Sequence, residues 1–181
     1  MVEISLVQLS SRPVLHSQLP GGNMASAIVY FYSCGPVQGH LSTDEAEQAF
    51  VLGRDQYGVM QFDSVFVSST FRAVQTFAMV CRGAQWSNRA FIETLPGAEY
   101  LNTIGVRDVI EELVDAGKIQ GRIDGTPGRV LVMAHTPLIN SVISLCHNPR
   151  RNPNFLHGIR AEIFDERGST GVIRWQSQGL I

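Results

Sequence analysis

Short apolar runs alternate with helical patterns along most of the chain. Three runs rich in β-branched and aromatic residues, at 27–32, 64–69 and 129–135, predict buried strands of a parallel sheet. Each run is followed by a segment whose apolar residues recur every three or four positions, which predicts an amphipathic helix. This alternation predicts an α/β domain, a three-layer α/β/α sandwich with a mostly parallel sheet.

The predicted helices are defined by their apolar faces. In chain order, these faces are Ala46, Ala49, Phe50 and Gly53; Val74, Phe77, Ala78 and Cys81; Val106, Ile110, Leu113 and Val114; and Leu138, Val142, Leu145 and Cys146. One of Ser42, Thr43 and Asp44 is expected to cap the first helix. Gly117 is expected to end the third helix, over about residues 104–116.

The two ends of the chain lie outside this alternation. Residues 1–26 hold a short apolar run followed by Pro and Gly, and we interpret them as an extension, either an edge strand or a loose arm. Residues 27–181 are then the folded domain. Near the C-terminus, residues 161–175 form two strand-like runs around a glycine-containing turn, which predicts a hairpin at one edge of the sheet.

Composition narrows the class of protein. A length of 181 residues fits one domain, and a net charge of -2 argues against nucleic acid or a membrane surface as the main partner. No apolar run reaches the ~20 residues that a membrane helix needs, and no signal-peptide pattern is present. The three cysteines are far apart and lack CxxC spacing, so no disulfide, metal or cofactor is expected and the predicted location is cytoplasmic.

Polar residues gather where the predicted strands end, which is where ligands bind to an open α/β sheet. They are Ser33, Cys34 and Gly35; Ser68, Ser69 and Arg72; and His135 and Thr136. Arg72 stands in the first turn of a helix, where a cation opposes the helix dipole by ~0.3–1 kcal/mol, so we interpret it as an anion ligand. The position of His135 fits a functional residue and a hydrogen-bonded core residue equally. Glu93, considered by itself, fits a surface residue better than a catalytic one.

These segments resemble, in their order, the histidine phosphatase superfamily, whose best-known branch is the cofactor-dependent phosphoglycerate mutases. The strongest match is DSVFVSSTFRAVQTF at 63–77, with paired serines before Arg-Ala-x-Gln-Thr, and segments 41–53, 92–97 and 131–140 match in order. In the segment at 41–53, Glu45 stands where the family usually has Gly. The resemblance implies a phosphoglycerate mutase-like fold, phosphate binding by Arg72 and His135, and proton transfer by Glu93.

The sequence departs from the family at the end of the first strand. The family has Arg-His-Gly there, in which the Arg binds phosphate and the His takes the phosphoryl group. The tripeptide here is Ser33-Cys34-Gly35. Ser33 has a hydroxyl that can donate a hydrogen bond but no charge. Cys34 does not begin the Cys-x5-Arg loop of cysteine-dependent phosphatases, because the residue six positions later is His40 and not Arg.

We therefore expect a degenerate histidine phosphatase-like domain, because loss of a nucleophile can cost ~10⁶ in kcat. It would keep part of a phosphate pocket, with little or no phosphatase activity, and bind a phosphorylated small molecule or a phosphoprotein. The candidate residues are Cys34, Glu93 and His135 at catalytic positions and Ser33, Arg72 and His135 at phosphate-binding positions.

Two alternatives stay open at this stage. One is an active phosphomonoester hydrolase that uses Cys34, or an imidazole such as that of His40, as its nucleophile. The other is a structural or oligomerisation role built on residues 1–26.

Because Cys34 is expected near Arg72 and His135, whose positive charges would lower the pKa of a thiol, we also expect it to be the most reactive of the three cysteines.

Overall fold

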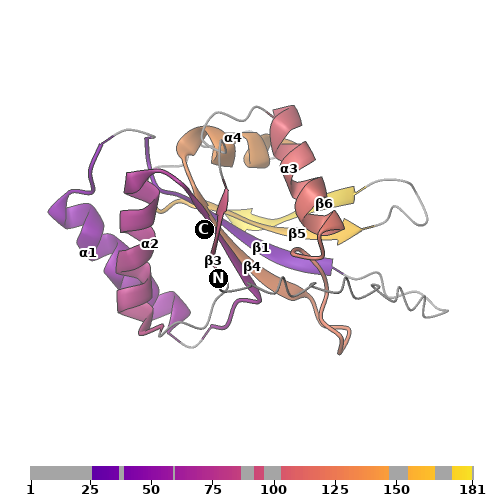
Figure 1. Ribbon diagram of the computed structural model, residues 1–181, viewed down its shortest axis with the longest axis horizontal. Coiled ribbons are helices and arrows are strands. Elements are labelled where there is room, and N and C mark those ends of the chain that lie inside the picture. Colours follow the sequence, from indigo (N-terminus) through magenta and orange to yellow (C-terminus); the bar gives the residue numbers. More distant parts are fainter. Residues whose placement is uncertain are drawn as a thin grey trace, which may run out of the picture.

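Figure 1 shows the computed structural model of the chain, which describes residues 26–36, 39–58, 60–86, 92–95, 103–146, 155–165 and 173–180. Apart from Ser26, the extension predicted at residues 1–26 lies outside the described residues, as does the turn of the predicted C-terminal hairpin. In the part of the chain that is described, no helix is both long enough and apolar enough to cross a membrane.

The centre of the molecule is a six-stranded sheet with the strand order β3-β2-β4-β1-β5-β6. The strands are β1 (Ser26–Ser33), β2 (Ser64–Ser68), β3 (Ile92–Leu95), β4 (Gly128–Ala134), β5 (Gly158–Asp165) and β6 (Ile173–Leu180). The first four strands in spatial order are parallel to one another. At one edge, β5 pairs antiparallel with β1, and β6 pairs antiparallel with β5. The three predicted core strands and the two strands of the predicted hairpin are confirmed, and β3 is a strand that the sequence pattern did not predict.

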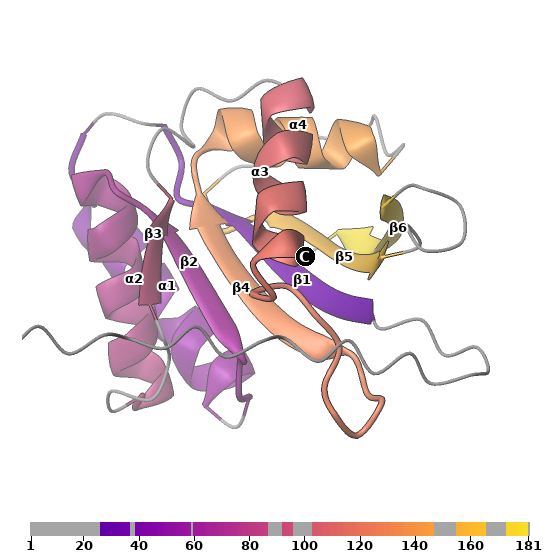
Figure 2. The same cartoon turned by 45° about the vertical axis from the view of Figure 1, so that its right-hand side comes forward.

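Helices cover both faces of this sheet (Figures 1 and 2). One face carries α1 (Thr43–Leu52), its π-helical continuation η1 (Gly53–Tyr57) and α2 (Phe71–Ala84). The other carries α3 (Thr103–Asp115) and α4 (Thr136–Leu145). Successive residues of a strand point to opposite faces, so Phe31 packs with α3 and α4 while Tyr32 packs with α1 and α2. The predicted three-layer α/β/α sandwich is confirmed.

The ends of two helices follow the sequence prediction. Ser42 is the residue that caps α1, and its hydroxyl accepts a hydrogen bond from the Glu45 amide at 3.2 Å. Gly117 follows α3 with a positive φ of 67°, the left-handed conformation that glycine adopts without strain. The apolar faces predicted for α3 and α4 are buried or packed against the core beneath them.

The buried face of α2 differs from the predicted one by one position. Val74 is 50% exposed, and the residues that pack inward are Ala73, Thr76, Phe77, Val80 and Ala84. The prediction was wrong because it followed apolar residues alone, whereas this face also carries Arg72 and Thr76, two buried polar residues. One consequence is that Cys81 is only partly buried.

Two glycines bring the α1–η1 segment and α2 into backbone contact. A Cβ on Gly83 would lie 1.9 Å from the carbonyl oxygen of Phe50, and one on Gly53 would lie 2.1 Å from that of Val80. No side chain fits at either position, so the crossing point of the two helices is fixed at the backbone. This crossing also sets the distance between the N-terminal turns of the helices that carry Glu45 and Arg72.

Candidate functional site

The candidate site lies where β1, β2 and β4 end, at one edge of the sheet. Ser33 closes β1, Ser68 closes β2, and His135 follows β4 directly. The first turns of α2 and α4 begin at the same edge, since each helix starts within three residues of its strand. The structure thus brings Ser33, Cys34, Arg72 and His135 together, as the sequence analysis expected from strand order.

The turn after β1 is held by the Ser33 hydroxyl. This oxygen accepts a hydrogen bond from the Gly35 amide at 3.1 Å and shares another with the Thr136 hydroxyl at 3.0 Å. Gly35 has a φ of 80°, and a Cβ there would lie 3.1 Å from Nη2 of Arg72. Glycine is therefore needed both for the backbone conformation and for the close approach of the guanidinium.

Cys34 is turned into the core between the sheet and α1 and α2, with 0% of its surface exposed. Burial raises the pKa of its thiol to about 12, although a hydrogen bond with Thr76 and the charge of Arg72 both act to lower it. The thiol is protonated at neutral pH and has no access to a substrate. The expectation that Cys34 is the most reactive cysteine is therefore wrong, because it weighed the neighbouring charges and not the burial.

We expect iodoacetamide to label Cys81 well before Cys34. Burial also raises the pKa of Cys81, to about 11, but its side chain is partly exposed on α2. Cys146 is 8% exposed and has its pKa raised to about 11 by burial, so it should fall between them. Brief treatment followed by peptide mass spectrometry ranks the three, and labelling in urea should make them equal. If Cys34 were labelled fastest, its thiol would be accessible and reactive, and Cys34 would again be a candidate nucleophile.

Arg72 is a buried cation whose three nitrogens all contact groups of the protein itself. Its side chain is 6% exposed. Nε donates to the carbonyl oxygen of Cys34 at 2.6 Å, and Nη1 donates to that of His40 at 2.7 Å. Nη2 forms an ion pair with the carboxylate of Glu45, and the guanidinium lies 5.5 Å from the centre of the Phe155 ring.

Glu45 is held by both of its carboxylate oxygens. Oε1 accepts the hydrogen bond from Arg72, and Oε2 accepts from the amide of Ser42 at 2.9 Å and from its hydroxyl at 3.0 Å, which completes a capping box at the start of α1. Partial desolvation raises the pKa of this carboxyl, but the hydrogen bonds from Ser42 and Arg72 outweigh it and leave the pKa below its ordinary value. Glu45 is therefore charged at neutral pH.

His135 is fully buried, and both of its ring nitrogens face protein groups. Nδ1 lies 3.2 Å from the carbonyl oxygen of Gly35, and because a carbonyl only accepts, Nδ1 carries the proton in this bond. Nε2 is hydrogen-bonded to the hydroxyl of Thr70, which also accepts from the Ala73 amide at 3.4 Å and so caps α2. The histidine thereby ties the β1 turn to the start of α2.

Two further candidates stand on β3 and in the segment after β1. The backbone of Glu93 pairs with Phe66 in the middle of β2, and its side chain lies outside the described part of the structure. The ring of His40 packs edge-on against Phe71, with ring centres 5.3 Å apart. Among the residues that the structure describes, no group of three or more His, Cys, Asp or Glu side chains has the arrangement of a metal site.

Sequence reasoning missed Glu45, Thr70 and Phe155 as members of the site. The Ser42-x-x-Glu45 spacing does carry the capping-box signal, which would have placed the carboxylate in the first turn of α1. The contact of Glu45 with Arg72 joins residues 27 positions apart and depends on how α1 crosses α2, so no local pattern predicts it.

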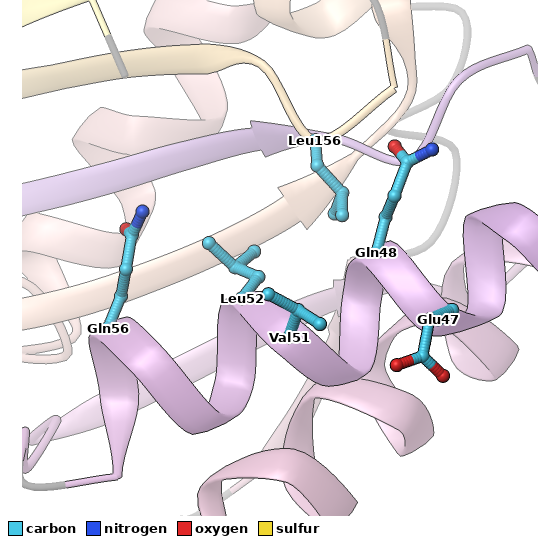
Figure 3. A pocket seen from close by; sticks show the side chains of 6 residues that line it. All are labelled: Glu47, Gln48, Val51, Leu52, Gln56 and Leu156. Carbon is cyan, nitrogen blue, oxygen red and sulfur yellow. The ribbon is translucent and has the colours of Figure 1, made fainter.

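A groove of about 320 Å³ lies beside the site, between the α1–η1 segment and the turn that precedes β5 (Figure 3). It is lined by Glu47, Gln48, Val51, Leu52, Gln56 and Leu156. Figure 3 shows Leu156 directed toward Leu52 from the turn that precedes β5. The amide of Leu156 donates to the carbonyl oxygen of Ser33 at 2.7 Å, which fixes this turn, and with it Phe155, beside the candidate site.

The sheet order, the helices on both faces and the polar cluster at the carboxyl edge of the sheet together define the class of fold. It is the α/β sandwich of phosphoglycerate mutases and related histidine phosphatases, and the fold implied by the sequence resemblance is confirmed.

Comparison with known proteins agrees at the level of fold. No protein-family model and no curated protein matches the sequence. Among solved structures, the protein histidine phosphatase SixA complexed with tungstate has 20% identity, covers 86% of this chain and 96% of its own, and gives a TM-score of 0.56. A phosphoglycerate mutase from Bacillus anthracis has 16% identity, covers 86% and 93%, and gives 0.56. A mycobacterial glucosyl-3-phosphoglycerate phosphatase has 15% identity, covers 85% and 97%, and gives 0.58.

Proposed function

We propose that this chain is a degenerate member of the histidine phosphatase superfamily that keeps part of an oxyanion pocket and has little or no phosphatase activity. The observation that carries this proposal is the state of Cys34, which stands at the position of the family's nucleophilic histidine. It is fully buried, and burial raises the pKa of its thiol to about 12. A protonated thiol without access to solvent does not attack phosphorus.

The groups that would stabilise phosphoryl transfer already bond to other groups of the protein. The reaction needs fixed donors aimed at the equatorial oxygens of the phosphoryl group. Ser33 stands where the family has an Arg, and its hydroxyl is bonded to Thr136. Arg72 is paired with Glu45, and His135 is bonded to Thr70. These groups are thus already engaged by the protein, which supports weak binding and inefficient chemistry.

The ligand class we propose is a phosphorylated small molecule or a phosphoprotein. Support comes from the buried guanidinium of Arg72, since arginine suits the planar, two-point recognition of phosphate oxygens. The SixA structure holds tungstate, and one of the mycobacterial phosphatase structures holds VO3, so oxyanions bind to other proteins of this fold. We also propose a cytoplasmic location, because free cysteines suit a reducing compartment.

The test is turnover of an aryl phosphate by the purified protein. We expect hydrolysis no faster than in a buffer control, because Cys34 is a buried, protonated thiol and His135 is fully buried. Cys34→Ala is the matched variant and should behave like the wild type. A robust rate would reject the proposal in favour of an active hydrolase, and its loss in Cys34→Ala would identify Cys34 rather than another group as the nucleophile.

A further inference from the structure

We propose that Glu45 is an internal competitor for oxyanions at Arg72, so that an external phosphate binds there only when the Glu45 carboxylate leaves. This inference rests on the proposed function, since it concerns the same pocket. It is carried by one contact, the ion pair between Nη2 of Arg72 and Oε1 of Glu45. One carboxylate oxygen, Oε1, occupies Nη2, where an oxygen of a phosphate would otherwise accept a hydrogen bond.

The orientation of Arg72 makes this contact decisive for ligand access. Its Nε and Nη1 are fixed by the carbonyl oxygens of Cys34 and His40, which no ligand replaces without disrupting the backbone turn. Nη2 is therefore the nitrogen whose present partner, a side chain rather than the backbone, can be exchanged. Because the side chain of Glu45 is 26% exposed and that of Arg72 only 6%, the carboxylate covers the guanidinium on its solvent side.

The position of Glu45 is set by the start of α1 rather than by Arg72 alone. The capping box with Ser42 holds the second carboxylate oxygen, so Glu45 is in place before any ligand arrives. A phosphate that approaches Arg72 meets a guanidinium whose charge is already neutralised and a carboxylate that repels it. The contact therefore keeps the affinity for oxyanions low and gives α1 control over the pocket.

The experiment compares tungstate and inorganic phosphate binding by calorimetry in the wild type, Glu45→Gln and Glu47→Gln. Gln at position 45 keeps the capping box while removing the charge. Glu47→Gln removes the same charge from an exposed position of the same helix (Figure 3). We expect Glu45→Gln to bind both anions at least about 10-fold more tightly than the other two proteins, since repulsion at contact distance is lost.

Adding Arg72→Lys to Glu45→Gln should abolish the gain, because Lys lacks the planar fork. The inference would be overturned if the gain survived in the double variant. It would also be overturned if the wild type, Glu45→Gln and Glu47→Gln bound the anions with equal affinity. If Glu45→Gln lacks a cooperative thermal transition, Glu45→Ala takes its place with the same expected gain. Turnover by the wild type would reject the proposed function whatever Glu45→Gln binds, whereas equal binding without turnover would reject only the role of Glu45.

Discussion

Replacement of Arg72 by Gln is expected to lower the free energy of unfolding by about 3 kcal/mol or more. The change breaks a partly buried ion pair and leaves the carboxylate of Glu45 without its cation. It also removes the donors to the carbonyl oxygens of Cys34 and His40. The guanidinium thus holds the β1 turn and the starts of α1 and α2 together, whether or not it binds a ligand.

Urea unfolding at neutral pH measures this effect through a fall in the midpoint at an unchanged m-value. The matched control is Arg54→Gln, which breaks the ion pair between Arg54 and Asp55, two side chains that are each more than half exposed. We expect no measurable change there, because exposed ion pairs contribute little. Equal stability of Arg72→Gln and the wild type would mean that Arg72 is not the structural centre of the site.

A second large loss, again about 3 kcal/mol, is expected for Gly83→Ala. Alanine favours a helix over glycine by ~1 kcal/mol, so propensity alone would stabilise α2. The added methyl group, however, would lie 1.9 Å from the carbonyl oxygen of Phe50, which is backbone and has no rotamer to change. The two helices have to separate, and overpacking of this kind costs more than propensity returns.

Thermal and urea unfolding of Gly83→Ala should be compared with Gly125→Ala. Gly125 has a φ of 81° and open space around its Cβ position, so that variant isolates backbone strain of ~1 kcal/mol from steric overlap. Because the crossing at Gly83 positions Glu45 relative to Arg72, Gly83→Ala should also weaken their ion pair. A Gly83→Ala protein as stable as the wild type would contradict the close contact between α1 and α2.

The fold was largely predictable because its signals are local. Buried parallel strands appear as continuous apolar runs, and the helix ends at Ser42 and Gly117 carry recognisable residues. The prediction failed for β3, because a strand of four residues is too short to show a pattern of apolar and polar positions. It also failed for the buried face of α2. On α2 the apolar residues and the buried residues are not the same set, because Arg72 and Thr76 point inward.

The candidate site was predictable in part of its membership but not in its state. Strand order alone placed Arg72 and His135 at one edge of the sheet, since parallel strands end together. That Cys34 faces the core depends on the pleat of β1 and the packing of α2 over it. That Arg72 is neutralised by Glu45 depends on the crossing of two helices at Gly53 and Gly83. Both facts arise from tertiary structure, and they decide whether chemistry is available.

The central claim, that no nucleophile acts at the end of β1, is tested most directly by trapping a phosphoryl group on the protein. The wild type is incubated with an aryl phosphate, quenched, and measured by intact-protein mass spectrometry. The account predicts an unmodified mass, because Cys34 is buried with a pKa raised to about 12 and His135 is fully buried. A covalent phosphoryl adduct that maps to Cys34 or His135 would contradict it.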